Sequence, residues 1–235
     1  MGFMDGIKAR QALGKHQKGD YQGAMAEYKV LYEKGFISCS YLLPYTVLLL
    51  REGGEENYLK VKEILKRCEK ASDINQERRQ QLLMNYAVAQ YKLGEMEKAL
   101  QLLERSHQKG ACGLTYGALG FLYIEAGLAD KALAYNLEAL DYDDEDPVIL
   151  DNLAQTYYRL LNDKEKAREY FEKALEFKEG QIDTLYFLSL YDEEEGKYAA
   201  AAEKLEKALE GRFSPLNYAH KARVEETLAR VKGKM

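Results

Sequence analysis

The side chains that could act as acids, bases, nucleophiles or metal ligands are scattered through this sequence. Its three histidines, His16, His107 and His220, lie far apart, and none belongs to a helical pair of the kind that holds zinc. Cys112 follows His107 closely, but a nucleophile and its base need a third group to orient the base, and no such group accompanies them. The sequence therefore predicts no catalytic residue, no metal site and no cofactor site, and so no enzyme.

Two further motifs have the residue types of a binding site without the spacing. The glycines of GALG at 117–120 could approach a phosphate, but no strand precedes them and both fall within a helical period. The acidic stretches DYDDEDP at 141–147 and DEEEG at 192–196 lack the ligand spacing of a calcium loop. We interpret the glycines as points of close helix packing and the acidic residues as solvated turns and helix caps.

The composition favours exposed helices in an intracellular setting. The chain is 46% hydrophobic and 31% charged with only three prolines, which is typical of an all-α protein. Its net charge is −5 and its cations are dispersed, so phosphate neutralisation is weak and we expect no nucleic-acid partner. The three cysteines have no metal-ligand spacing, and we expect Cys39 and Cys68 to lie in the core. A reducing cytoplasm is the expected compartment.

No stretch of the sequence has the pattern of a leader or a membrane span. The first residues, MGFMDGIKARQALGKH, lack a long apolar stretch after a basic one. The longest apolar stretch, YLLPYTVLLL at 41–50, is about half a membrane span long and contains Pro44. We therefore expect no membrane association and interpret this stretch as a core helix.

The elements that organise the chain are repeated helical pairs. In residues 116–140, apolar and small residues at helical spacing precede Gly127, and a second such series follows it. Gly120 marks a close approach of two helices, and the alignment of Ala87 and Ala154 with it predicts that alanine would be tolerated there. The first series is Tyr116, Leu119, Gly120 and Tyr123, and the second is Ala132, Asn136 and Ala139. Each unit is therefore a helical hairpin.

The same hairpin recurs with a period of about 34 residues, which is the mark of a repeat protein. One downstream copy has an extra residue in its turn, and two copies near the N-terminus are weaker. The second helices of the clear copies carry Ala99, Leu103 and Ser106, then Ala167, Phe171 and Ala174, then Ala201, Leu205 and Ala208. Because one hairpin cannot bury its apolar faces alone, the copies must stack on one another.

The pattern resembles the tetratricopeptide repeat family in the motifs NYAVAQYKLGEMEKAL, GALGFLYIEAGLADKAL and LAQTYYRLLNDKEKAREYFEKAL. The resemblance implies an all-α, right-handed superhelical solenoid of helix-turn-helix units. We expect one solenoid domain over residues 1–235, with about six hairpins in 5–213 and a capping helix over 214–232. Ser214 and Pro215 have the residue types that begin such a helix.

In the family that the sequence resembles, the first helix of each hairpin lines an inner face that binds partner proteins. We expect the anchors of this groove to be Tyr91, Phe121 and Tyr158, with the Asn152 amide bonding a partner's backbone. The full set of expected groove residues is Met84, Val88, Tyr91, Phe121, Ile124, Asn152, Gln155, Tyr158 and Tyr186. Family members that bind chaperone tails use a cluster of cations on this face, and none is present here. We therefore expect an apolar or amphipathic peptide or helix of a protein partner.

Other functions stay open at this point. The alternative for each apolar residue of the groove set is packing between repeats. The alternative is a structural protein whose tyrosine-rich face pairs two copies into a homodimer or closes on its own N-terminus. RNA-binding helical repeats need a basic inner face, whereas this one carries Glu125, Asp151 and Glu193 against Lys92 and Arg159. The sequence does not identify the partner or the pathway.

Overall fold

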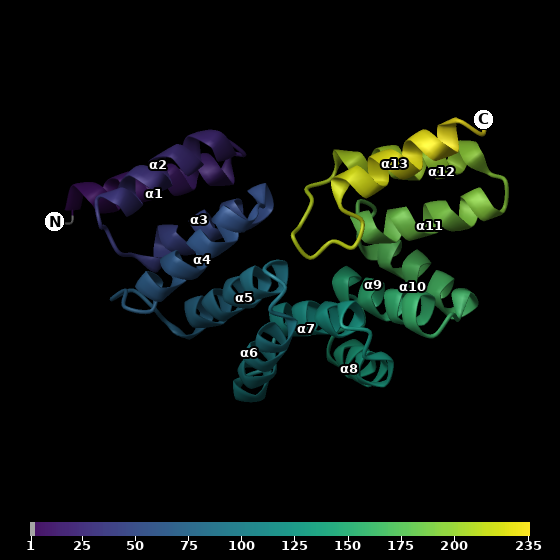
Figure 1. The fold of residues 1–235 in the computed structure, drawn as a ribbon, viewed down its shortest axis with the longest axis horizontal. Helices are drawn as coiled ribbons and strands as arrows, with labels where there is room; N and C mark the ends of the chain where they lie inside the picture. Colours follow the sequence, from purple (N-terminus) through teal and green to yellow (C-terminus); the bar gives the residue numbers. More distant parts are fainter. Residues whose placement is uncertain (1–2) are drawn as a thin grey trace. The chain divides into compact units, whose positions relative to one another are not determined.

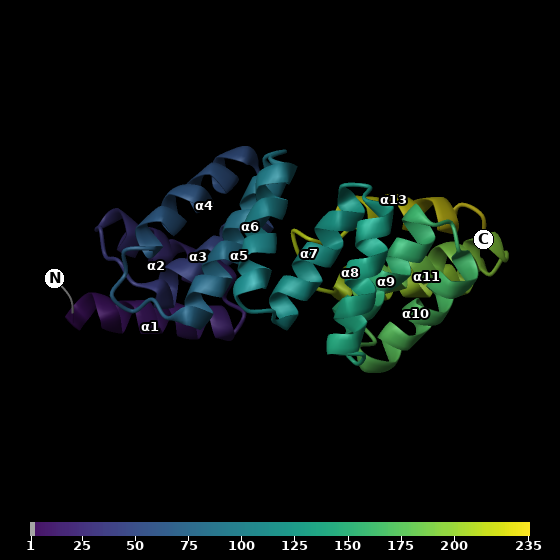
Figure 2. The same ribbon diagram turned by 90° about the horizontal axis from the view of Figure 1, so that it is seen from below.

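The computed structural model describes residues 3–235, and every regular element in this range is a helix. The chain divides into two compact units, which we call unit 1 (residues 1–108) and unit 2 (residues 109–235). Figure 1 and Figure 2 show the helices of each unit from two directions. None of the helices in residues 3–235 is long and apolar enough to cross a lipid bilayer.

Unit 1 is built from three successive pairs of helices joined by short connections. They are α1 (Phe3–Gln17), α2 (Tyr21–Glu33), α3 (Cys39–Glu52), α4 (Glu55–Cys68), α5 (Gln76–Lys92) and α6 (Met96–Lys109), whose last residue belongs to unit 2. Tyrosine rings fill much of the core, and Tyr28 lies with its ring centre 6.0 Å from that of Tyr41 and 5.9 Å from that of Tyr45. Cys39 and Cys68 are buried here, which confirms the core position expected for both.

Unit 2 contains three further hairpins and a terminal helix, in the order that the repeat pattern predicts. Its elements are α7 (Gly113–Glu125), α8 (Ala129–Tyr142), α9 (Pro147–Gln155), the π-helical turn η1 (Thr156–Leu160), α10 (Lys164–Phe177), α11 (Ile182–Glu194), α12 (Tyr198–Glu210) and α13 (Lys221–Lys232). The all-α fold is confirmed. The inclusion of all hairpins in one domain stays a prediction.

Glycines with positive φ end the first helix of most hairpins. Gly94, Gly127 and Gly196 have φ values of 78°, 69° and 74°, a region that residues with a Cβ rarely adopt. The residue after each glycine donates its backbone N–H to a carbonyl of the first helix, such as Leu128 to Tyr123 at 3.1 Å. This pattern of bonds satisfies carbonyls that the helix end would otherwise leave unpaired.

The hairpin of α9 and α10 accommodates one extra residue inside its first helix. Residues Thr156–Leu160 form a π-helical turn, and the Asp163 N–H closes the hairpin turn by donating to the Tyr157 carbonyl at 2.9 Å. Asn162 occupies the left-handed region with φ 55°, where the other hairpins have glycine. The extra residue is thus absorbed between Tyr157 and Asp163.

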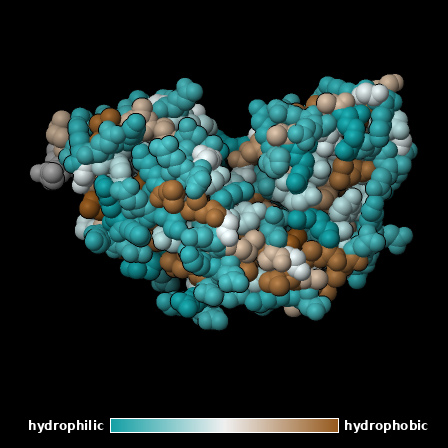
Figure 3. Space-filling view, in the orientation of Figure 1, coloured by the Kyte–Doolittle hydropathy of each residue, from teal (hydrophilic) through white to brown (hydrophobic). Residues whose placement is uncertain are grey.

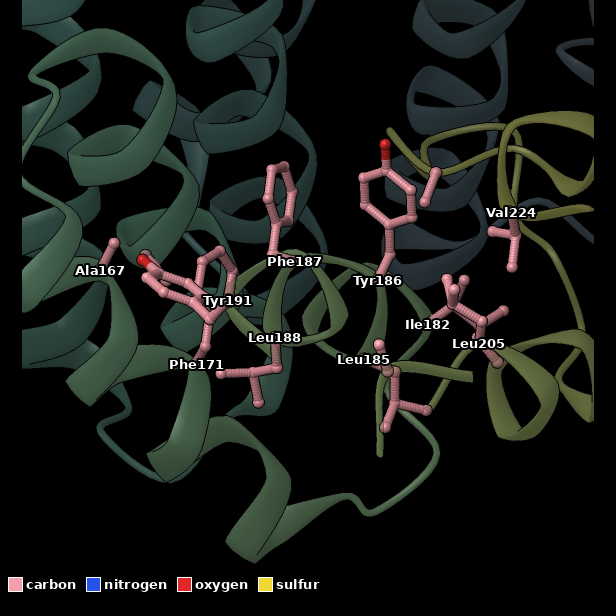
Figure 4. Packing of buried hydrophobic residues seen from close by; sticks show 14 of the residues in the cluster. Ala167, Phe171, Ile182, Leu185, Tyr186, Phe187, Leu188, Tyr191, Leu205 and Val224 are labelled. Atoms are coloured by element: carbon pink, nitrogen blue, oxygen red, sulfur yellow. The ribbon is translucent and has the colours of Figure 1, made fainter. Parts of the chain in front are cut away.

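The side chains of α11 divide the core of unit 2 into two faces. Figure 4 shows Leu185 and Leu188 pointing to one side of this helix, with the rings of Tyr186 and Phe187 on the other. Phe187 stacks on Phe171 of α10, with ring centres 5.0 Å apart and an angle of 14° between the planes. All five of these side chains are buried in one hydrophobic cluster. The second face of α11 is therefore covered as well as the first.

The terminal helix begins later than the sequence predicts. α13 starts at Lys221, with the His220 ring nitrogen accepting the Arg223 N–H at 3.2 Å, so the expected capping helix over 214–232 is corrected to Lys221–Lys232. Ser214 and Pro215 instead lie in an irregular connection, which we call the 211–220 segment. The Ser214 hydroxyl accepts the Leu216 N–H at 3.2 Å, which makes a local turn and no helix.

The exposed surface is mostly polar. Figure 3 shows that hydrophilic side chains cover most of the face drawn there, with hydrophobic ones in separate patches. Leu59 in unit 1 and Phe177 in unit 2 are examples of large apolar side chains that are more than a third exposed, at 53% and 44%. Single exposed apolar residues of this kind are ordinary and do not by themselves mark a site.

Candidate functional site

In unit 1, the expected groove residues all lie on α5. Val88 is buried, whereas Met84 and Tyr91 are half-buried. The Lys92 ammonium lies 4.9 Å from the centre of the Tyr91 ring, within the range of a cation–π contact. Met84 and Tyr91 are thus partly accessible, and their binding role stays a prediction.

In unit 2, Phe121 and Ile124 are buried, which corrects the expectation that they are exposed anchors. Their exposed fractions are 3% and 1%. The sequence interpretation assumed one packed face on α7, but every residue from Thr115 to Ile124 is buried. A helix that is apolar all round is typically buried all round, and α7 is such a helix. Neither side chain can contact a partner without movement of its surroundings.

The polar groove residues of α9 bond within the chain. Asn152 donates from Nδ2 to the Gly117 carbonyl at 2.8 Å, so its amide already bonds a backbone group of this chain. Gln155 donates from Nε2 to Asp151 Oδ2 at 2.7 Å, and the Thr184 hydroxyl donates to Asp151 Oδ1 at 2.6 Å. All of these groups are buried, and they join α7, α9 and α11 through hydrogen bonds.

The π-helical turn places Tyr158 and Arg159 where they contact neighbouring elements. The half-buried Tyr158 ring lies 5.0 Å from that of Phe187 and 5.7 Å from that of Tyr191. Arg159 donates from Nη1 to Gln155 Oε1 at 3.0 Å and forms an ion pair with Glu125 at 2.7 Å. Turns of this type often occur at functional sites, because they redirect the side chains that they carry.

The 211–220 segment lies against α11 and the π-helical turn. Figure 1 shows it extending from the start of α13 toward α9 within unit 2. The Tyr218 ring stacks on Phe187 with centres 5.2 Å apart and planes 19° apart, and it lies 6.2 Å from the ring of Tyr186. The Arg159 guanidinium lies 3.9 Å from the centre of the same ring. Tyr186, a predicted groove residue, is therefore covered by the chain itself.

The Asp183 carboxylate fixes the backbone of this segment. Its Oδ1 accepts the Ala219 N–H at 2.8 Å, and its Oδ2 accepts the Tyr218 N–H at 3.2 Å and the Asn217 amide at 3.0 Å. Asp183 is itself buried, with 3% of its surface exposed. A buried carboxylate that accepts several N–H groups holds a polypeptide in one orientation.

Burial dominates the ionisation of the two carboxyl groups in this region. Burial raises the pKa of Asp151, and the charge of Asp183 raises it further, against the opposing hydrogen bonds from Thr184 and Gln155. Burial also raises the pKa of Asp183, whereas the bonds from the 211–220 segment and the Arg159 charge lower it. The buried carboxyl groups of Asp151 and Asp183 thus favour the neutral form more than exposed carboxyl groups do.

Sequence reasoning did not identify Asp183, Tyr218 or the 211–220 segment as parts of this surface. The connection of residues 211–220 between α12 and α13 is longer than that of residues 178–181 between α10 and α11, but the helix-start residue types of Ser214 and Pro215 concealed this length in the sequence. A longer connection next to an inner helix face has room to fold onto that face. Ala219, Val224 and Val231 are buried.

The comparisons with known proteins agree with this architecture. A tetratricopeptide repeat family model matches residues 149–181, which contain most of the hairpin of α9 and α10. No curated protein matches the chain. A tetratricopeptide repeat protein from Parabacteroides merdae has a similar structure, with a TM-score of 0.76 and 14% identity over 97% of this chain and 84% of that one.

Two further solved structures share the fold. A thermophilic tetratricopeptide repeat protein of Thermus thermophilus has a TM-score of 0.59 and 20% identity, over 84% of this chain and 98% of that one. YrrB, described as a tetratricopeptide repeat protein with an unusual peptide-binding site, has a TM-score of 0.50 and 18% identity, over 76% of this chain and 88% of that one. Residues 149–181 thus match a tetratricopeptide repeat, and the chain has the fold of a tetratricopeptide-repeat solenoid.

Proposed function

We propose that this chain is a protein-interaction scaffold that binds an extended or amphipathic segment of a partner protein on its first helices. The observation that carries the proposal is in unit 2, where polypeptide from outside the hairpins already lies on α11. Asp183 holds the backbone of that polypeptide, and Phe187 and Arg159 hold its ring. Backbone hydrogen bonds combined with side-chain contacts are the usual means of recognising a peptide.

The residues proposed to contact a partner differ in accessibility. Tyr186 lies against the Tyr218 ring of the 211–220 segment, whereas the half-buried Tyr158 lies against Phe187. Met84 and Tyr91 are partly accessible on α5. Phe121, Ile124 and Val88 are buried, and the Asn152 amide joins α9 to α7 through the Gly117 carbonyl. The peptide-binding site reported for YrrB supports the same class of function for a protein of this fold.

Site-specific photo-crosslinking in the native host tests the proposal. A photoreactive amino acid in place of Tyr158 should crosslink the partner, because this position lies at the proposed surface. The matched control replaces Tyr170, a half-buried tyrosine on α10 whose ring stacks on Tyr157 with centres 5.8 Å apart. Crosslinks of equal yield from both positions, or none from Tyr158, would contradict a site on the first helices.

Light scattering separates the scaffold from the structural alternative. A scaffold should be a monomer in the absence of its partner, and its crosslinks at position 158 should be to a different protein. A dimer that persists on dilution, with crosslinks to a second copy of the chain, would favour a structural self-associating protein and would overturn the proposal.

A further inference from the structure

The 211–220 segment is held in unit 2 as a bound peptide would be held. It contains no helix or strand, and its exposed residues include Ser214 and His220. Two consecutive backbone amides, from Tyr218 and Ala219, both donate to the Asp183 carboxylate. This arrangement recognises the course of a backbone and would serve any sequence that can present two successive N–H groups.

The Tyr218 ring supplies a side-chain anchor at the centre of the same contact. Guanidinium groups lie 3.9 Å and 4.0 Å from the ring centre, from Arg159 and from Arg223 of α13. Phe187 lies flat against the ring. An aromatic side chain that contacts cations and another ring is the type of anchor that supplies most of the energy in a peptide interface.

We propose that Asp183, Phe187 and Arg159 form a receptor for an extended peptide with an aromatic side chain, and that the 211–220 segment fills it as an internal ligand. The inference rests on the proposed function and adds the chemistry of the ligand and its regulation. A partner peptide that presents an aromatic residue followed by a small one, as Tyr218 and Ala219 do, competes with the segment for the receptor.

Because the segment is part of the chain, it has an advantage over a free peptide in binding the receptor. A segment joined to its receptor by a short connection has an effective concentration on the order of millimolar, so a weak internal contact suffices to exclude a free peptide. Weakening the internal ligand should therefore raise the apparent affinity for an added peptide. The receptor residues Asp183, Phe187 and Arg159 stay unchanged in such a variant.

The test uses the full chain and a fluorescent peptide of residues 212–221, RFSPLNYAHK. Fluorescence anisotropy should show that the double variant Asn217→Ala/Tyr218→Ala binds this peptide at least tenfold more tightly than the wild-type chain does. The same peptide with alanine in place of its tyrosine should bind neither protein. Adding Arg159→Ala to the double variant should weaken the binding again, because only the Arg223 guanidinium is then left to contact the tyrosine ring.

A matched variant and a second measurement keep the test decisive. Tyr170→Ala removes a half-buried tyrosine elsewhere in unit 2, and it should bind the peptide as weakly as the wild type. Circular dichroism melts should confirm that each variant is folded. If the double variant is unfolded, hydrogen exchange in Asn217→Ala takes its place, with faster exchange at the Tyr218 and Ala219 amides expected than in the wild type.

A folded double variant that binds the peptide no more tightly than the wild type overturns the inference. So do unchanged exchange rates in Asn217→Ala, and so does a wild-type dimer that the double variant loses, since the segment would then bind a second copy. These results leave the proposed function intact if Tyr158 still crosslinks a partner. Conversely, peptide binding without any partner crosslink at Tyr158 would support the receptor and contradict the scaffold.

Discussion

Asn136 of α8 occupies the space that a side chain on Gly120 of α7 would need. A Cβ atom added to Gly120 would overlap Asn136 Oδ1 and would lie 3.2 Å from Asn152 Nδ2. Asn136 is fully buried, and its Nδ2 donates to the Thr156 hydroxyl at 3.0 Å. The neighbouring hairpins have Leu103 and Phe171 at the matching place of the second helix. The Asn136 side chain therefore fits against α7 because position 120 has no Cβ atom.

Gly120→Ala should destabilise the chain by about 1–3 kcal/mol, because Asn136 must rotate away from its bond to Thr156. This corrects the expectation, drawn from Ala87 and Ala154, that alanine would be tolerated. Gly120→Leu should be worse. Urea unfolding would measure the change, with Gly180→Ala as control, since a Cβ there meets no atom within 4 Å. If the overlap is the cause, Asn136→Ala should reduce the additional loss from Gly120→Ala.

Phe121→Ala should lower the free energy of unfolding by about 3–5 kcal/mol, the usual effect of emptying a buried aromatic site. Phe177→Ala is the matched control, since that ring is 44% exposed and should contribute less than about 1 kcal/mol. Thermal and urea unfolding would compare the two variants. A Phe121→Ala protein as stable as the control would show that the ring is accessible, as the sequence interpretation expected.

The stability of unit 2 should fall as the pH rises above the ordinary Asp pKa of about 3.9. Burial raises the pKa of Asp151 in the folded chain, so the folded state keeps a proton that the unfolded state releases. Each pH unit in that range then reduces the free energy of unfolding by up to about 1.4 kcal/mol. Urea unfolding between about pH 5 and pH 8, where raised carboxyl pKa values lie, would measure this slope.

Asp151→Asn should reduce this pH dependence, because it removes one of the two buried carboxyl groups whose pKa is raised. The exposed Asp144 offers the matched control, since Asp144→Asn should retain the wild-type slope. Equal slopes in all three proteins would show that Asp151 does not keep its proton on folding.

Asp73→Ala should destabilise unit 1 by about 1–2 kcal/mol at neutral pH, the usual effect of losing a helix cap. Its carboxylate accepts the Cys39 N–H at 2.9 Å and the Ser40 N–H at 3.2 Å at the start of α3. Burial alone would raise the pKa of Asp73, but these bonds, the Ser38 hydroxyl and the Arg78 charge hold it below its ordinary value.

The pH dependence at Asp73 should have the opposite sign to that at Asp151. Because the folded pKa is lowered, the stabilisation is present above the ordinary Asp pKa and is lost as the pH falls below it. The difference between the wild type and Asp73→Ala should therefore shrink in acid, as urea unfolding at about pH 3 and pH 7 would show. A difference that is constant with pH would indicate a packing role for Asp73.

The sequence predicts the helices and turns well because these depend on local chemistry. Gly127 ends its helix as expected, and Gly94 and Gly196 do the same in their hairpins, since only glycine adopts their positive φ easily. The spacing of apolar residues likewise places Leu103, Ala132 and Phe171 in the core. Such features can be predicted without knowing which residues pack against them.

The candidate site was harder to predict because it depends on contacts between distant residues. Helical spacing gave the face on which Phe121 lies, but it does not say what covers that face. Ser214 and Pro215 have the residue types of a helix start, yet the chain stays irregular up to His220, where Asp183 and Phe187 hold Tyr218. The relevant partners lie more than thirty residues earlier in the chain.

The π-helical turn lets the α9 and α10 hairpin hold one more residue than the preceding hairpin without changing the points between which it folds back. Its closing bond joins Tyr157 to Asp163, and the bond at the same place in the preceding hairpin joins Tyr123 to Leu128. Both hairpins therefore fold back between equivalent points, although one has a residue more. An additional residue of this kind can present a side chain such as Arg159 to a neighbouring element without changing where the hairpin folds back.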